Sequence, residues 1–241
     1  MSWIYAGNKW YDGMYLTDDQ MRRCQQHEEH EQLQLKKRTR VETQVKSCQS
    51  TMETMLASDK YSDLILVSKE GERIIAHRCL LTASSQSLAE MLEVLERGDW
   101  AENKGSEKSI ELQMPQSAAA IRGMLRFIYA GKVDVDHLEA DLAGMLELSS
   151  LHALDALKAA CADYAFEALT PLNAVSFVVL SDLHDLPDLF KKCALLIKSN
   201  AAITLSRQFK KIEKDNPPLF GKLRVALGLP ENEEEESQPK G

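Results

Sequence analysis

The segment Tyr61–Val133 constrains the fold more than any other part of this chain, because short strand patterns and helix patterns alternate in it. Its first strand is apolar, a polar turn follows, and the second strand leads directly into a helix. The predicted elements are strands at Ser62–Val67, Arg73–Ala76 and Ser109–Leu112, helices at Ala83–Leu95 and Gln116–Tyr129, a turn at Lys69–Glu72 and a surface loop at Glu96–Ser109. This order predicts an α+β fold, mostly α, in which a small sheet is flanked by helices.

Three short motifs lie in this segment. Ser62-Asp63 opens the first strand, Ala76-His77-Arg78 follows the second, and residues 127–131, which read FIYAG, end the last helix. In this order and spacing they resemble the BTB/POZ domain, whose hallmarks are an S/T-D-hydrophobic strand, an A-H-[KR]-x-x-L step and an F-[IL]-Y-[TS]-G helix end. Ala130 stands where the family has a small hydroxyl residue. The resemblance implies a dimerising adaptor module in which Asp63, His77, Tyr129 and Gly131 have structural roles.

The composition fits a soluble globular protein. Hydrophobic residues make up 44% and charged residues 27% of the 241-residue chain, which is ordinary for such proteins. The first residues lack an apolar segment behind a basic start, so we expect no secretory signal. A net charge of −8 argues against general nucleic-acid binding. Five widely scattered cysteines suit reduced thiols in the nucleus or the cytoplasm.

A long helix is predicted before the first motif. No glycine or proline interrupts residues 18–57, and Thr17 fits the N-cap. In its second half an apolar seam repeats at spacings of four and three, formed by Val41, Val45, Cys48, Met52 and Met55. Residues 1–15 are aromatic and polar without a clear period, so they are left unassigned, either as a mobile terminus or as a docking segment.

The region after residue 133 is expected to form helical hairpins. Helix patterns occur at Leu138–Leu148, Ala153–Phe166, Asn173–Leu183, Pro187–Ser199 and Leu219–Leu227, with breaks at Ser149-Ser150, Leu169–Pro171 and His184–Leu186. The runs LKAAC and SDLH within this region resemble the helices that follow the BTB core in speckle-type POZ proteins, up to their 3-box. Relatives in that group carry a MATH domain before the BTB domain, and we expect this chain to lack one.

The predicted organisation has five parts. They are an aromatic segment at 1–15, a long helix at 16–57, a BTB/POZ domain at 58–168, a helical 3-box or BACK-like extension at 169–228 and an acidic disordered tail at 229–241.

No constellation of residues predicts catalysis, a cofactor or a metal. Cys24, His27, His30 and Cys48 lie on one predicted helix, whereas structural zinc sites draw paired ligands from separate segments. No nucleophile motif, phosphate-binding loop or dinucleotide fingerprint occurs. The basic cluster at Lys36–Arg40 is flanked by acidic residues, and a solvated helix face is favoured over a nuclear-import or nucleic-acid patch. His77 is interpreted as structural, and His184 is expected to bond backbone groups in its turn.

The resemblance also implies two protein-binding surfaces. In relatives the helix before the S-D strand packs across a two-fold axis, so a homodimer interface is expected at Met52, Met55, Leu56 and Leu80. Adaptors of the group bind a cullin through a hydrophobic-x-Glu motif after the second core helix. An ungapped alignment puts Glu96-Arg97-Gly98 there, and Val94-Leu95-Glu96 fits with a shift of two residues.

Two functions remain open from the sequence. The first is a homodimeric adaptor that presents a protein substrate to a cullin-RING ubiquitin ligase of the cullin-three type. The alternative is a dimeric scaffold or transcription regulator outside the ligase system, pairing with itself or with MATH-BTB relatives. No membrane partner is expected, and an enzyme lacks any supporting residues.

Overall fold

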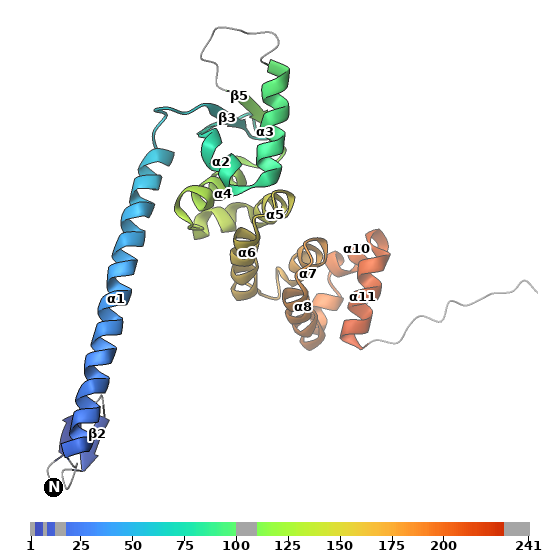
Figure 1. Ribbon diagram of the computed structural model, residues 1–241. Coiled ribbons are helices and arrows are strands. Elements are labelled where there is room, and N and C mark those ends of the chain that lie inside the picture. The colour runs from blue at the N-terminus through green and yellow to red at the C-terminus, as the bar shows by residue number, and fades with distance from the viewer. Residues whose placement is uncertain (1–2, 7–8, 13–17, 100–109, 229–241) are drawn as a thin grey trace, which may run out of the picture. The chain divides into compact units, whose positions relative to one another are not determined.

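The computed structural model describes residues 3–6, 9–12, 18–99 and 110–228. The chain divides into two compact units, Met1–Met55 and Leu56–Gly241, whose elements are labelled in Figure 1. The predicted cap at Thr17 and the acidic tail at 229–241 lie outside the described residues.

The first unit consists of a hairpin and a long helix. Strands β1 (Trp3–Ala6) and β2 (Lys9–Asp12) pair antiparallel, with Trp3 opposite Asp12. The unassigned segment therefore contains a hairpin, and its aromatic content was the signal for strands, because aromatic residues favour sheets even without alternation. Helix α1 runs from Asp18 to Leu56, as predicted (Figure 1).

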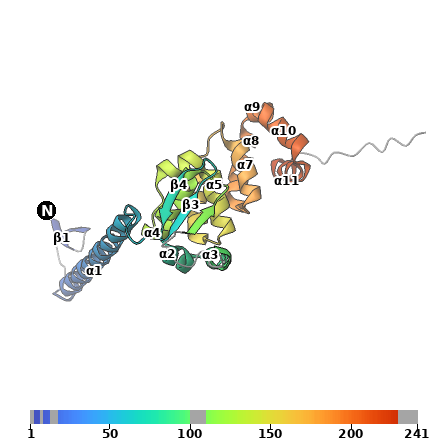
Figure 2. The ribbon, with the colours of Figure 1, turned by 90° about the horizontal axis from the view of Figure 1, so that it is seen from above.

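The second unit begins with a three-stranded sheet. Strands β3 (Leu64–Val67), β4 (Arg73–Ala76) and β5 (Ile110–Gln113) have the order β4-β3-β5, with β3 antiparallel to β4 and parallel to β5. One face of the sheet is apolar and buried through Leu64, Leu66, Ile74, Ala76, Ile110 and Leu112. Figure 2 shows this sheet with helices gathered around it. The alternating burial of β4 explains why its limits were predicted correctly.

Helices α2 (Arg78–Ser84) and α3 (Gln86–Asp99) replace the single helix predicted at Ala83–Leu95. Ser85 separates them with an extended backbone, φ −151° and ψ 126°. Its hydroxyl accepts from the Leu88 amide and donates to the His152 carbonyl, so it caps α3 and ties it to a later helix. The loop predicted from Glu96 is wrong in its first four residues, because α3 continues to Asp99.

Helix α4 (Ala118–Ala130) begins at a serine cap and ends at a glycine. The Ser117 hydroxyl accepts from the Ala120 amide, and Gly131 has φ +63°, the left-handed conformation predicted for it. Helix α5 (Val135–Leu151) has non-helical dihedral angles at Asp141. The break predicted at Ser149-Ser150 is wrong, because both residues lie inside α5 and the Ser149 hydroxyl donates to the Leu146 carbonyl one turn earlier.

The remaining helices lie in the region after residue 133 that the sequence predicted to be helical. They are α6 (Asp155–Glu167), α7 (Ala174–Leu183), α8 (Pro187–Ser199), α9 (Ala201–Thr204), α10 (Arg207–Asp215) and α11 (Pro217–Leu227). Helix α8 packs against both α7 and α11. Caps at Asn200, Ser206 and Asn216 explain the short connections at the end of the chain. The predicted α+β fold, mostly helical with a small sheet and a long N-terminal helix, is confirmed.

Candidate functional site

The two best-defined sequence motifs meet at a buried pair, His77 and Tyr129. His77 follows β4 and Tyr129 lies in the last turn of α4, and both side chains are at most 5% exposed. Nδ1 of His77 is 2.7 Å from the Tyr129 hydroxyl oxygen, which also accepts a hydrogen bond of 2.9 Å from the His77 backbone amide. Nε2 of His77 lies 3.2 Å from the Lys60 carbonyl oxygen.

These contacts assign the proton on the imidazole. A carbonyl oxygen can only accept, so Nε2 carries the hydrogen and donates to Lys60. Nδ1 then accepts from the Tyr129 hydroxyl. Burial raises the pKa of Tyr129 to about 12, so the phenol remains a donor at neutral pH. The pair therefore fixes the start of α2 against α4.

Asp63 and Arg78 form the second anchor of this region. The Arg78 backbone amide and Nε each donate to an Asp63 carboxylate oxygen at 2.8 Å. Burial opposes ionisation of Asp63, but the hydrogen bonds from Arg78 outweigh it, so the pKa of Asp63 is lowered. Arg78 Nη1 also donates to Glu96 Oε1 on α3. One guanidinium thus links β3, α2 and α3.

The predicted cullin-facing residues lie on the last turns of α3. We call Val94, Leu95 and Glu96 the α3 surface. Val94 is 67% exposed, Leu95 is partly buried, and the Glu96 side chain is 39% exposed. Because α3 extends through these residues, they sit in regular helix and not at the start of a loop. An exposed valine therefore lies two residues before a carboxylate whose position Arg78 fixes.

The predicted dimer residues are partly exposed. Met52 and Met55 belong to α1 in the first unit, and Leu56 and Leu80 belong to the second. Leu80 lies on α2 next to Leu81, which is fully buried. Whether these four side chains meet a second copy stays a prediction.

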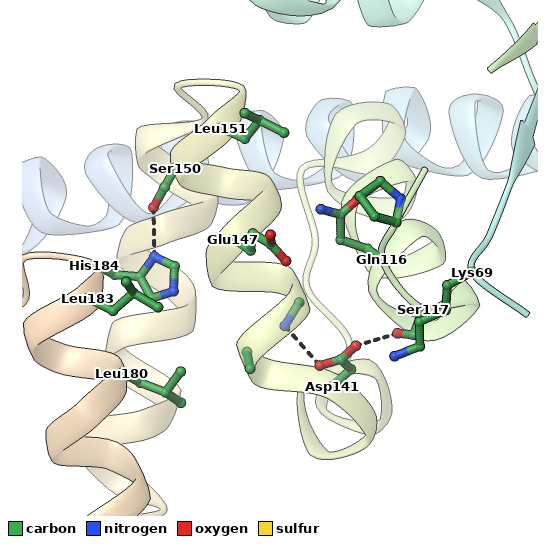
Figure 3. A pocket seen from close by; sticks show the side chains of 13 residues that line it. Lys69, Gln116, Ser117, Asp141, Glu147, Ser150, Leu151, Leu180, Leu183 and His184 are labelled. Carbon is green, nitrogen blue, oxygen red and sulfur yellow. Dashed lines mark hydrogen bonds between the residues drawn. The ribbon is translucent and has the colours of Figure 1, made fainter. Parts of the chain in front are cut away.

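A groove of about 690 Å³ lies between α5, the start of α4 and the end of α7 (Figure 3). Exposed Leu151 and Leu183 give it an apolar side. His184 Nδ1 lies 3.1 Å from the Ser150 hydroxyl, so this histidine bonds a side chain of α5, in contrast to the backbone contact expected from the sequence. Burial lowers the pKa of His184, Lys158 lowers it further and Glu147 opposes this.

Asp141 organises the other end of the groove. One carboxylate oxygen accepts from the Ser117 hydroxyl, and the other accepts from the Gly144 amide at 2.8 Å. Asp141 therefore caps the second part of α5 across its kink and holds the serine that caps α4. Figure 3 shows this carboxylate between the two helices.

The described residues contain no group of three or more His, Cys, Asp or Glu side chains arranged to hold a metal ion. All five cysteines are free thiols, and burial raises the pKa of Cys161 and of Cys193 to about 12. Within the described ranges, no helix has the length and apolar character of a membrane span.

Sequence reasoning missed several contacts, among them the Arg78–Glu96 pair, the Ser117–Asp141 cap and the Ser150–His184 bond. Arg78 was visible in the A-H-R motif, but its partner is 18 residues away. The serines carry no period or spacing signal, so nothing in the sequence singles them out.

Part of the chain matches a known domain and proteins that are named for it. Residues 52–169 match the sequence model of the BTB/POZ domain. The chain is 27% identical to human Kelch-like protein 24 over 152 residues, 63% of this chain and 24% of that protein. It is 28% identical to human BTB/POZ domain-containing protein 9 over 155 residues, 64% of this chain and 24% of that protein. The chain thus spans about a quarter of the length of these curated relatives.

Among solved structures, the BTB domain of human gigaxonin aligns with 49% of this chain and 89% of its own length. The sequence identity is 18% and the TM-score is 0.38.

Proposed function

Because residues 52–169 of this chain form a BTB/POZ domain, we propose that the protein is a homodimeric adaptor that presents a partner protein to a cullin-RING ubiquitin ligase. The coarser role, a BTB scaffold that works through protein–protein contacts and without chemistry of its own, is common to the family. The more specific role, presentation of a partner to a cullin-RING ligase, rests on surfaces of the second unit. The proposed compartment is the nucleus or the cytoplasm, in keeping with free thiols.

The α3 surface is the observation that carries this proposal. Val94-Leu95-Glu96 has the hydrophobic-x-Glu order of speckle-type adaptors, and regular helix presents it. Val94 is largely exposed, and such a side chain gains free energy when a partner covers it. Arg78 binds one oxygen of Glu96 and holds the carboxylate in place. Because the side chain is already ordered, it loses less conformational entropy when a partner binds it.

The groove between α5 and α7 offers a second contact for the same partner. It combines apolar Leu180 and Leu183 with polar Glu147 and Lys69, a mixture typical of a peptide-binding groove.

The proposed mechanism is positioning. Two BTB domains in one dimer hold two recruited molecules beside two ligase scaffolds, which raises the effective concentration of substrate near the ligase. The recruiting element is the first unit, or the second subunit of a mixed dimer with a MATH-BTB relative.

Binding of a cullin-three type N-terminal domain tests the proposal. We expect saturable binding to the immobilised chain, and Val94→Asp should weaken it at least about tenfold, because a charge would replace a buried apolar contact. Gln208→Asp, which adds the same charge at an exposed position of α10, should bind like the unaltered chain. Absence of binding, or equal binding by both variants, would overturn the adaptor role.

A scaffold outside the ligase system is the second candidate, and it is favoured by the ungapped alignment, which puts Glu96-Arg97-Gly98 where adaptors have their hydrophobic-x-Glu motif. If Arg78 satisfies Glu96 internally, a cullin gains little from that carboxylate. In that case Arg78→Met should create or strengthen cullin binding, whereas under the adaptor proposal it should weaken binding because Glu96 is no longer held.

A further inference from the structure

Helix α1 carries an exposed apolar stripe outside the BTB domain. Val41 is 57% exposed and Val45 is 48% exposed, and Cys48 is also exposed. With Met52 and Met55 they repeat at spacings of four, three, four and three residues along one helix. This is the spacing of a coiled-coil seam. Val41, Val45 and Cys48 precede residue 52, where the match to the BTB/POZ domain begins.

The helix is long, and most of its other residues are polar. Its 39 residues extend about 58 Å at 1.5 Å per residue. The pairs Arg23–Asp19 and Arg38–Glu42 join residues four apart along its surface and help to keep it helical in water. The stripe is therefore presented on a continuous rod, and its apolar area is open to a partner.

The charges at the N-terminal end of the stripe complement those of a second copy of this chain. Val45 and Met52 take position a of a heptad, while Val41, Cys48 and Met55 take position d. Lys37 then occupies a g position and Glu42 the following e position. In a parallel, in-register pair of helices, g of one copy lies beside the next e of the other, so Lys37 and Glu42 meet with opposite charge on both sides.

We propose that the α1 helices of two copies form a parallel, in-register coiled coil over Val41–Met55. This inference rests on the homodimer proposed above and extends its interface beyond the BTB domain. The apolar seam ends at Val41, with the Lys37–Glu42 pairs at its N-terminal edge, because the preceding a positions hold Arg38 and Glu31 and like charges would face each other there.

Two heptads are too short to hold two helices together by themselves. A dimer of the BTB domains makes the association of the two helices favourable, since it brings them to a high effective concentration. The coiled coil therefore forms only after the domains pair, and it sets the direction in which both N-terminal segments project.

Cys48 gives a direct test of the arrangement. In a parallel, in-register pair the two Cys48 side chains face each other at a d position, within reach of a disulfide. Cys24→Ser with Cys79→Ser leaves Cys48 as the exposed thiol, since Cys161 and Cys193 are buried. Diamide then accepts two electrons and two protons as two thiols form one S–S bond.

We expect efficient cross-linking of Cys48 on a non-reducing gel. A second reporter, Val41→Cys with Cys48→Ser, should cross-link as well, because in-register d positions meet along the whole seam. The matched control, Ser50→Cys with Cys48→Ser, places the thiol on the outward face and should cross-link far less. Val45→Asp should reduce the Cys48 product at least about tenfold, because two carboxylates would be buried face to face.

Light scattering separates the two proposals. A dimer whose Cys48 and Val41→Cys reporters cross-link no better than the Ser50→Cys control would overturn the coiled coil and leave the domain dimer standing. Cross-linking of Cys48 without cross-linking at position 41 would indicate antiparallel helices and would also overturn it. If the chain is monomeric, both the domain dimer and the coiled coil are contradicted.

Discussion

The Tyr129 hydroxyl lies 2.7 Å from Nδ1 of His77 and accepts a hydrogen bond from the backbone amide of the same residue. This contact joins two motifs that are 52 residues apart and couples the start of α2 to the end of α4. Because the pair is buried, neither partner can turn to water if the other is lost. The contact explains why the motif at Ala76-His77 and the motif at residues 127–131 occur in the same domain.

Removal of the phenol oxygen should therefore destabilise the domain. Tyr129→Phe leaves the His77 amide and Nδ1 without their partner, which costs about 1–3 kcal/mol. Thermal unfolding should show a lower Tm, with the helical signal at low temperature unchanged. Tyr61→Phe removes a hydroxyl from a side chain that is 83% exposed and should leave the Tm unaltered. Equal effects of the two substitutions would contradict the role of the pair.

Two glycines in helical segments should respond in opposite ways to alanine. Gly131 has φ +63° and open space where a methyl group would lie, so Gly131→Ala should cost about 1–2 kcal/mol from backbone strain alone. Gly221 lies inside α11 with open space around it, so Gly221→Ala should gain about 0.5–1 kcal/mol. Urea unfolding of both variants measures the difference, and a stabilising Gly131→Ala would contradict the left-handed cap.

Stability should fall in mild acid. Burial lowers the pKa of His152 and of His184 below the ordinary value of 6.5. The unfolded chain therefore binds protons that the folded chain does not, so the stability contributed by these residues is present above pH 6.5 and is lost as the pH falls through the folded pKa values.

Urea unfolding from about pH 7.5 to about pH 5.5 spans the titration of an unfolded histidine and measures this loss. His152→Gln with His184→Gln should flatten the decline. His30→Gln, at an exposed position of α1, is the control and should leave it unchanged. A decline equally steep in the double variant would show that other groups cause it.

The dimer prediction depends on the end of α1. Met52→Asp with Leu56→Asp places charges on the proposed two-fold interface, and the molar mass should fall from twice 27.1 kDa to 27.1 kDa. The far-ultraviolet circular dichroism should keep its helical form. Ser50→Asp with Thr54→Asp, on exposed positions of the same helix, should remain dimeric. A dimer that survives the first pair of changes would place the interface elsewhere.

The elements that were predicted well depend on local signals. The alternation in β4 and the glycine after α4 act within a few residues, so the sequence alone defines them. The same is true of α1, which has no helix-breaking residue from Asp18 to Leu56.

The errors come from contacts that are distant in sequence. Ser85 separates α2 from α3, and its hydroxyl donates to the His152 carbonyl 67 residues away. Continuation of α3 through Glu96 brings that carboxylate to Arg78 on α2. His184, which follows α7, bonds Ser150 on α5, 34 residues earlier in the chain. Local propensity cannot predict such contacts, because tertiary packing decides them.

Light scattering of the chain with a cullin-three type N-terminal domain, on a sizing column at tens of micromolar, tests the central claim most directly. The adaptor proposal predicts that the chain alone elutes at twice 27.1 kDa and that the mixture gives one species with two cullin domains for each dimer. A dimer that does not change in mass when the cullin domain is added would contradict the ligase role, and a chain that elutes at 27.1 kDa would contradict the dimer itself.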